Sequence, residues 1–399
     1  MPLSRRSFLN VVSPLRAGPL PGALMAARGR EAAFALGGSP PADAAGDGAE
    51  IRIDSNENPL GPGPAAVEAF VRAFPDAGRY PTNARPNVAD LREAIARRNS
   101  VRAENVALGS GSWEILCSAV RIYTSSSRHL VTASPSFESP EHMAEQLGTP
   151  VKRVPVDKDG RLDLDKMAQA ARWAGLVFFC NPNNPTGTVH SAKAVAEFVA
   201  RVRRESPETA ILIDEAYHDY VTDPAYATAM GLALENPNVF VARTLSKAYG
   251  MAGLRVGYAI GQPRTIEAFN RWAITFNQNT LTVAAAVASL GDPAHIDAER
   301  ARNTEVRTFT TRFFEGLGYR VLPSQTNFVF VEIGRPSKEF KEACAKHKVM
   351  VGREFPPLEK TYARVSLGTL DEMKRANHVF TEVLGKRTGG GGASALAQK

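Results

Sequence analysis

The sequence predicts an α/β protein, with a large domain built on a mostly parallel sheet covered by helices and a smaller α+β domain built from both chain ends. Short apolar, β-branched runs alternate with longer segments of helical period, which is the pattern of βαβ units. After about Asp292 this alternation gives way to a long polar segment and short strands. The chain also has 399 residues, more than one hydrophobic core usually accommodates.

The large domain is expected to contain a series of buried strands separated by helices. Runs with almost no polar residue predict strands that are covered on both faces of a parallel sheet. Segments of helical period between them predict the covering helices. The expected strands are 105–108, 129–133, 176–180, 210–214, 239–243 and 256–260, and the expected helices include 112–123, 140–147 and 191–204.

The smaller domain is expected to begin with a long polar helix over 298–317. Short strands follow at 319–322, 327–332, 349–351 and 363–367, and a helix over 371–384 closes the fold. We expect an extension at 1–49, the large domain at 74–290, the smaller domain at 50–73 and 291–386, and a flexible tail at 387–399.

The first 49 residues differ in composition from the rest of the chain. Arg5 and Arg6 are followed by bulky apolar residues, which resembles the start of a twin-arginine (Tat) export signal, and Ala33-Phe34-Ala35 has the form of a cleavage site. This pattern predicts export to the periplasm. The alternative is an Ala-rich extension on a cytoplasmic protein.

The net charge of +7 raises the question of nucleic acid or membrane partners. Residues 1–49 and 386–399 together hold five of these excess positive charges, so the folded body is nearly neutral. No run of about 18 apolar residues predicts a membrane span. The three cysteines have no metal-ligand or disulfide-framework spacing. We therefore expect no nucleic acid partner, no membrane span and no metal site.

The most informative polar residues follow the expected strands, because ligands of open α/β sheets bind beyond the carboxyl ends of the strands. Strand 239–243 leads into Thr244, Ser246 and Lys247, and Arg255 lies eight residues further on. A desolvated lysine suits Schiff-base chemistry, and the hydroxyls with the arginine suit a phosphate. A lysine after a strand is more often an ordinary surface lysine.

The other strand ends carry polar residues as well. Asp214 ends a buried strand, where its carboxylate needs a partner such as a cationic ring nitrogen or a helix N-terminus, and Tyr217 follows three residues later. Asn184 lies in a proline-framed loop over 181–187. The small residues of 109–112 open a helix and leave backbone N–H groups for an anion, although such a turn alone is weak evidence.

Taken together, these motifs resemble the fold-type I pyridoxal-phosphate (PLP) aminotransferases of class I/II, and within them the histidinol-phosphate aminotransferase-like branch. The order N-P-x-N-P-T-G, D-E-A-Y, S-K and an arginine eight residues later is specific, and the resemblance covers about 51–385. It implies a large PLP-binding domain. It also implies transfer of an amino group from an L-amino acid to a 2-oxo acid by a ping-pong cycle, with glutamate and 2-oxoglutarate as one pair.

The resemblance implies a role for each residue of the cofactor site. Lys247 is expected to bind PLP as a Schiff base and then to move the proton between Cα and C4′. Asp214 is expected to keep the ring nitrogen protonated, so that the cofactor serves as an electron sink. Asn184 and Tyr217 are expected to hydrogen-bond the ring oxygen O3′, and Phe137 to stack on the ring.

The resemblance also implies a phosphate site, a shared dimer site and a substrate clamp. Tyr80 matches a tyrosine that reaches the neighbouring subunit's phosphate, which implies a homodimer. Arg364 is expected to hold the substrate α-carboxylate, and Asn58 belongs to a segment that closes over the substrate. The expected phosphate ligands are the N–H groups of Ser112 and Trp113 with Thr244, Ser246 and Arg255.

Two departures from the branch bear on the substrate. Trp113 stands where an aspartate is usual, and Gly352 occupies the place of an arginine that helps to hold the phosphate of histidinol phosphate, with Arg353 next to it. We therefore expect an unphosphorylated amino acid, aromatic or otherwise apolar. The alternatives are histidinol phosphate itself, and a decarboxylase, lyase or synthase on the same cofactor. A ligand-sensing regulator would need a DNA-binding module, for which 1–50 is too short.

Overall fold

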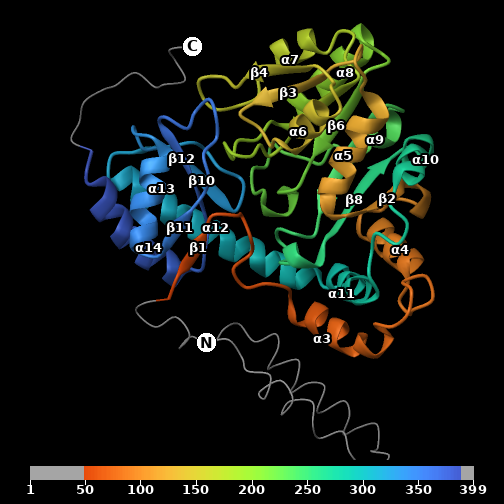
Figure 1. Ribbon diagram of the computed structural model, residues 1–399, viewed down its shortest axis with the longest axis horizontal. Coiled ribbons are helices and arrows are strands. Elements are labelled where there is room, and N and C mark those ends of the chain that lie inside the picture. Colours follow the sequence, from red (N-terminus) through yellow and green to blue (C-terminus); the bar gives the residue numbers. More distant parts are fainter. Residues whose placement is uncertain (1–48, 388–399) are drawn as a thin grey trace, which may run out of the picture. The chain divides into compact units, whose positions relative to one another are not determined.

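A seven-stranded sheet with the order β2-β8-β7-β6-β5-β3-β4 forms the centre of the computed structural model (Figure 1). Neighbours among β3 to β7 pair in parallel, and β8 alone runs antiparallel to its neighbours β7 and β2. The strands are β2 (Val106–Ser110), β3 (Leu130–Ser134), β4 (Val151–Pro155), β5 (Leu176–Cys180), β6 (Ala210–Asp214), β7 (Val239–Thr244) and β8 (Val256–Gly261). The prediction of an α/β fold with a mostly parallel sheet is confirmed.

Helices cover the sheet (Figure 1), and apolar side chains of the helices and the sheet are buried together in three clusters. The helices α5 (Gly111–Tyr123), α6 (Ser139–Gln146) and α10 (Pro263–Trp272) pack into one apolar cluster with the sheet. A second cluster contains side chains of α7 (Leu164–Ala170), α8 (Ala192–Glu205) and α9 (Met230–Glu235). A third contains those of α3 (Pro64–Arg72), α4 (Val88–Arg98) and α11 (Thr280–Leu290).

The remaining elements form a smaller α+β arrangement. The strand β1 (Ile51–Ile53) pairs in parallel with β11 (Val349–Val351), which joins the start of the described chain to its C-terminal part. The strands β12 (Tyr362–Ser366), β10 (Phe328–Glu332) and β9 (Arg320–Val321) form an antiparallel sheet. The helices α12 (Pro293–Gly316), α13 (Ser337–Lys346) and α14 (Leu370–Leu384) contribute to the same apolar cluster.

Several elements differ from the sequence prediction. The edge strand β4 was not predicted, because its sequence Val-Lys-Arg-Val-Pro leaves most of its residues partly or fully exposed. The helix α12 begins at Pro293 with Asp292 as its N-cap, five residues before the expected start. The elements that were not predicted also include α3, α4, α7, α9, α10, α11 and α13 and the short 3₁₀ helices η2 (Phe74–Asp76), η3 (Ala103–Asn105), η4 (His218–Tyr220) and η5 (Ala252–Leu254).

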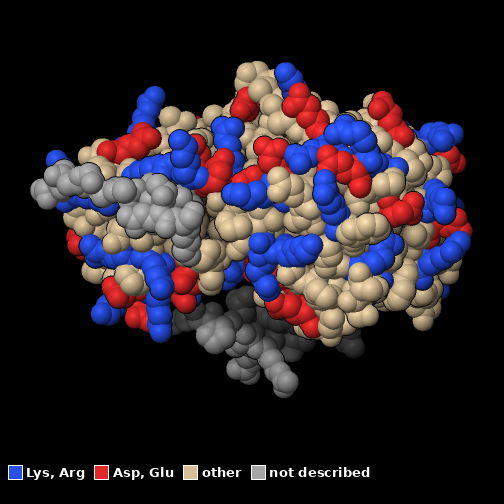
Figure 2. All heavy atoms as spheres, turned by 90° about the horizontal axis from the view of Figure 1, so that it is seen from above, with Lys and Arg blue, Asp and Glu red and all other residues tan. Residues whose placement is uncertain are grey.

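The structure describes residues 49–387. The expected export signal with Arg5 and Arg6, and nearly all of the expected tail, lie outside this range. No helix of residues 49–387 is long and apolar enough to cross a membrane. On the face shown in Figure 2, basic and acidic residues are interspersed, and no large area carries a single sign of charge. The boundary between the large and the smaller domain stays a prediction.

Candidate active site

A cavity of about 650 Å³ lies at the carboxyl ends of the parallel strands, between the large sheet and the strands β1, β11 and β12. Most residues singled out by the sequence line this one cavity, as expected for strand ends of an open α/β sheet. They are Ser112, Trp113, Phe137, Asn184, Asp214, Tyr217, Thr244, Ser246, Lys247, Arg255, Arg353 and Arg364. Tyr80 and Asn58 do not belong to this lining.

Lys247 presents its amine inside the cavity. Its Nζ donates a hydrogen bond of 3.1 Å to the carbonyl oxygen of Asn56 and lies 5.7 Å from the ring centroid of Tyr217. Burial lowers the pKa of Lys247 to about 8, and the positive charge of Arg364 acts in the same direction. At pH 7 roughly a tenth of the amine is therefore neutral, far more than for a lysine in water, and the neutral amine is the nucleophilic form.

Asp214 ends β6 with its carboxylate buried, and Oδ1 accepts a hydrogen bond of 3.2 Å from the backbone N–H of Ala216. Burial raises the pKa of Asp214 to about 7, and the negative charge of the adjacent Glu215 also raises it, whereas Lys247 lowers it. A buried carboxylate of this kind becomes stable in its charged form when a cation binds beside it. Asp214 therefore offers a site for a cationic ring nitrogen.

Arg364 lies on β12, and its guanidinium is held from both sides of the cavity. It donates hydrogen bonds of 2.9 Å to Oδ1 of Asn184 and 2.7 Å to the carbonyl oxygen of Asp54. The guanidinium packs over the rings of Phe328 and Phe355, and its buried Nε has no partner within the described residues. Burial lowers the pKa of Arg364 to about 10. A carboxylate is the natural ligand for such a desolvated guanidinium.

The phosphate turn, residues 108–114, leads from β2 into α5 and is packed tightly against Arg255. A Cβ at Gly111 would lie 2.1 Å from Nη2 of Arg255, and a Cβ at Gly257 would lie 2.1 Å from the backbone nitrogen of Ser112. Since β8 is antiparallel, Arg255 at its start lies at the edge where the parallel strands end. The N-terminus of α5 thus meets a guanidinium, an arrangement that binds anions.

Two hydroxyl groups complete the anion site. Thr244 donates a hydrogen bond of 2.8 Å to the hydroxyl of Ser246, and the backbone N–H of Ser246 donates one of 3.1 Å to the hydroxyl oxygen of Thr244. Nη1 of Arg255 lies 3.4 Å from the same Ser246 hydroxyl. Hydroxyls, a guanidinium and a helix N-terminus are therefore grouped at one end of the cavity, which fits a phosphate.

Asn56 is a site residue that the sequence analysis did not identify. It has a left-handed backbone (φ 55°), and its Nδ2 donates a hydrogen bond of 3.0 Å to the hydroxyl of Tyr217. Its backbone N–H donates to the hydroxyl of Ser366, and its carbonyl accepts from both Lys247 and Asn327. The sequence prediction named Asn58 in this segment, but no local pattern shows that Asn56 is the asparagine that faces the cavity.

Asn58, Tyr80 and Arg353 occupy more peripheral positions. Asn58 donates a hydrogen bond of 3.1 Å to the carbonyl oxygen of Ala248, so it supports the loop next to Lys247. Tyr80 is 65% exposed and stacks on Phe276 with 4.9 Å between the ring centroids. Arg353 lines the cavity, stacks over Phe355 and forms an ion pair with Glu138.

These residues fit PLP group by group. The cavity offers an amine with a lowered pKa for the aldehyde and a buried carboxylate for the ring nitrogen. For the phosphate it offers the N-terminus of α5 and Arg255, which Gly111 and Gly257 allow to approach each other closely. When bound, PLP supplies an electron sink for the substrate carbanion. Among residues 49–387, no group of three or more His, Cys, Asp or Glu side chains is arranged to hold a metal ion.

The sequence model of aminotransferase class I and II matches residues 50–380, which include every residue of this site. The chain belongs to the class I and II aminotransferases. As predicted from the sequence, it is a PLP-dependent enzyme that transfers the amino group of an L-amino acid to a 2-oxo acid.

Relatives of this aminotransferase carry two different substrate names. It is 38% identical over 337 residues to the histidinol-phosphate aminotransferase of Moorella thermoacetica, covering 84% of each chain. It is 40% identical over 308 residues to the aromatic amino acid aminotransferase of Nocardia farcinica, covering 75% of this chain and 84% of the other. The crystal structure of the Sinorhizobium meliloti histidinol-phosphate aminotransferase in complex with PLP matches with a TM-score of 0.77 and 29% identity, over 93% of this chain and 97% of that one.

Proposed function

We propose that this aminotransferase acts on an unphosphorylated L-amino acid with an aromatic or otherwise apolar side chain, with glutamate and 2-oxoglutarate as the second pair. The observation that carries this proposal is the ion pair between Arg353 and Glu138 at the cavity wall. Because Glu138 neutralises the guanidinium and would repel a phosphate, Arg353 is poorly placed to bind a dianion. Lys341 also lines the cavity and supplies a cation for the single side-chain carboxylate of glutamate.

The proposed roles of the site residues follow from their positions. Lys247 binds the cofactor aldehyde and then holds the proton that moves between the substrate Cα and C4′ of PLP. Asp214 holds the ring nitrogen. Asn184 and Tyr217 orient the ring oxygen, and Arg364 turns its guanidinium to the substrate α-carboxylate. Phe137 stacks on the ring, and the phosphate turn with Thr244, Ser246 and Arg255 holds the phosphate.

Histidinol phosphate is the second candidate donor. Arg353 does line the cavity, and proteins named for this substrate are similar to the chain over most of its length. An anionic substrate would need to displace Glu138 from the guanidinium. The two candidate donors therefore differ in whether the ion pair between Arg353 and Glu138 stays intact when the substrate binds.

A panel of amino donors tests the substrate proposal, with each half-reaction followed through the visible absorption of the lysine-bound cofactor. We expect phenylalanine, tyrosine or leucine to react with a higher kcat/KM than histidinol phosphate. Removal of the repelling carboxylate by Glu138→Gln should increase kcat/KM for histidinol phosphate by up to about fivefold, since an exposed ion pair is worth up to about 1 kcal/mol. Lys247→Ala serves as the inactive control. A preference of the wild type for histidinol phosphate would contradict the proposal.

We further propose a homodimer in which Tyr80 completes the partner's phosphate site. Segment 274–278 is tied to the phosphate turn, since Glu114 accepts from the backbone N–H of Ile274 and from Asn277, and Gln278 donates to the carbonyl of Gly109. Large apolar or aromatic side chains are exposed in this region, which suits an interface. These are Tyr80, Trp113, Ile274 and Phe276.

We infer a separate property, export, from the sequence alone. The support is the Arg5-Arg6 pair and the later Ala33-Phe34-Ala35, all outside the described residues. A reporter fused behind residues 1–40 should cross the inner membrane, and the change of both arginines to lysine should stop it. Equal transport of both fusions would rule out a twin-arginine signal.

A further inference from the structure

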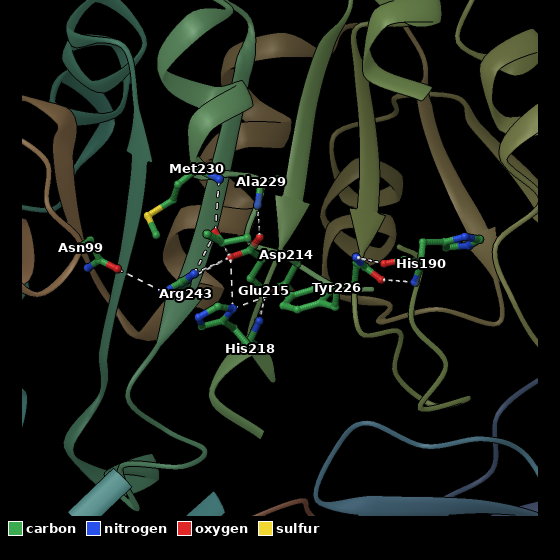
Figure 3. A network of polar contacts seen from close by, with 12 residues as sticks. Asn99, His190, Asp214, Glu215, His218, Tyr226, Ala229, Met230 and Arg243 are labelled. Atoms are coloured by element: carbon green, nitrogen blue, oxygen red, sulfur yellow. Dashed lines mark hydrogen bonds and ion pairs between the residues drawn. The ribbon is translucent and has the colours of Figure 1, made fainter. Parts of the chain in front are cut away.

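A buried ion pair lies directly behind the cavity residue Asp214 (Figure 3). Glu215 and Arg243 have side chains that are 1% and 8% exposed. Oε2 of Glu215 accepts hydrogen bonds of 3.0 and 2.8 Å from Nε and Nη2 of Arg243 and one of 2.8 Å from the hydroxyl of Thr228. Neither residue lines the cavity, so the proposed chemistry leaves the pair without a role.

The remaining polar atoms of the pair are also engaged. Oε1 of Glu215 accepts a hydrogen bond of 2.6 Å from the backbone N–H of Ala229, and Nη1 of Arg243 donates one of 3.1 Å to Oδ1 of Asn99 (Figure 3). Nη2 of Arg243 also reaches the hydroxyl of Thr228. The guanidinium is thus fixed by residues from separate parts of the chain. Arg243 is therefore held in one orientation, with its positive charge next to the carboxylate of Glu215.

The pair is coupled to the cavity through the backbone of β6. Asp214 is the last residue of β6, and Glu215 follows it directly. Asp214 faces the cavity, and Glu215 faces Arg243 on the neighbouring chain segment. Two buried carboxylates one residue apart repel each other, so the charge state of one depends on that of the other.

We propose that Arg243 is a positioning residue for the cofactor site: by neutralising Glu215, it allows Asp214 to carry the negative charge that holds the protonated ring nitrogen of PLP. This inference rests on the proposed role of Asp214. The negative charge of Glu215 raises the pKa of Asp214, after the larger effect of burial. Without Arg243, this repulsion would no longer be balanced, and Asp214 would more readily take up a proton and lose its hold on the ring.

Besides Arg243, the basic group beside the carboxylate of Glu215 is His218, whose Nδ1 lies 4.0 Å from Oε2. Burial and the arginines of this region lower the pKa of His218 to about 2, so His218 is neutral and adds no cation. Its Nδ1 lies 3.1 Å from the hydroxyl of Tyr226. The further titratable groups that act electrostatically on Asp214, on Arg243 or on this histidine are Lys247, Asp219, Tyr258, Tyr226, Arg98 and Arg300.

Charge variants test the proposal by the sign of their effect on cofactor binding. Arg243→Met should weaken PLP binding about tenfold, because one unit of pKa corresponds to that factor. Glu215→Gln should leave PLP binding as tight as in the wild type or tighter, because it removes the repelling charge. The double variant Glu215→Gln/Arg243→Met removes both charges and should bind PLP within about threefold of the wild type. Arg243→Lys keeps the positive charge and should lose less affinity for PLP than Arg243→Met.

A cofactor analogue separates an electrostatic role from a merely structural one. 1-Deazapyridoxal phosphate lacks the ring nitrogen, so Arg243→Met and the wild type should bind it equally well. Arg302→Met is the control, since it breaks the partly buried ion pair with Glu299 on α12, away from the cavity. It should leave the dissociation constant of PLP unchanged.

Several results would overturn the proposal. These are unchanged PLP binding in Arg243→Met, an equal loss for PLP and the deaza analogue, weaker PLP binding in Glu215→Gln, or an effect of Arg302→Met as large as that of Arg243→Met. If Arg243→Met alone does not fold, Glu215→Gln and the neutral double variant still show whether the negative charge of Glu215 opposes PLP binding. Failure of the wild type to take up PLP would instead refute the proposed function.

Discussion

Lys247 and Asp214 lie in the same cavity with pKa values shifted in opposite directions, and burial is the largest cause of both shifts. Burial favours the neutral form of each group, which is the amine for lysine and the carboxylic acid for aspartate. The cofactor-free site therefore disfavours both charges. A ligand that brings an aldehyde and a cationic nitrogen relieves both penalties at once, which is why these residues suit PLP.

The raised pKa of Asp214 leads to a stability prediction for the cofactor-free protein. Because its pKa rises from 3.8 to about 7 on folding, Asp214 contributes stability at low pH that is lost as the pH rises through 7. Asp214→Asn should therefore be more stable than the wild type at pH 8, by at most about 4 kcal/mol, and the advantage should shrink toward pH 4. Urea unfolding at both pH values measures this difference.

The same variant separates stability from function. Asp214→Asn should lose nearly all transaminase turnover, since an amide does not keep the ring nitrogen protonated. A stability difference that is equal at pH 4 and pH 8 would show that Asp214 is already charged in the cofactor-free protein. The stability of Lys247→Ala is measured at the same pH values, as a control for the loss of the other buried ionisable group of the cavity.

At the scale of elements, the phosphate turn depends on the close approach of β8 to α5. Gly257 lies opposite Gly109 and Thr244 in the sheet, and a Cβ there would lie 2.1 Å from the backbone nitrogen of Ser112. Gly257→Ala must therefore displace backbone rather than a flexible side chain. We expect a loss of about 1–3 kcal/mol in stability and a PLP dissociation constant raised at least tenfold.

Gly231→Ala on α9 is the matched control for this substitution. A Cβ at Gly231 meets no atom within 4 Å, and alanine favours a helix over glycine by about 1 kcal/mol. The unfolding free energy of Gly231→Ala should equal or exceed that of the wild type. An absorbance titration should show an unchanged affinity for PLP. If Gly257→Ala behaves like Gly231→Ala, the phosphate turn does not need the close approach.

The elements also show why part of the fold could be predicted and part could not. The strands β5 and β6 match their expected ranges residue for residue, because every position is buried and apolar until the polar end. The strand β4 escaped prediction because it lies at the edge of the sheet and exposes its charged residues. The local hydrophobic pattern of a sequence shows which strands are buried on both faces. An edge strand with exposed polar residues therefore gives only a weak sequence signal.

The same distinction holds for the site. Lys247, Asp214 and Asn184 follow buried strands, so the sheet alone places them in one cavity. Asn56 reaches the site through Ser366, which is 310 residues away in the sequence, and no local pattern shows that contact. The ion pair of Arg353 with Glu138 likewise joins residues 215 positions apart. Such contacts depend on how the smaller α+β part meets the large sheet.

At the scale of the whole molecule, the role proposed for the exposed Tyr80 means that one chain alone would not make a complete site. If Tyr80 serves the partner's phosphate, each site of a symmetric dimer combines residues of both subunits. Lys247→Ala and Tyr80→Ala then disable a site from different chains. Each homodimer should be impaired at limiting PLP, the first through loss of the amine and the second through weaker phosphate binding.

Heterodimers of these two variants decide whether the sites are shared. The subunits are co-expressed with different affinity tags, and the mixed dimer is purified through both. One site of this dimer carries both changes, and the other combines the intact Lys247 of one chain with the intact Tyr80 of its partner. The heterodimer should therefore recover about half of the wild-type activity per dimer, because one of the two symmetric sites is intact. If Tyr80 acted within its own chain, both sites would carry one defect and no recovery would occur. A failure to isolate mixed dimers would contradict the dimer itself.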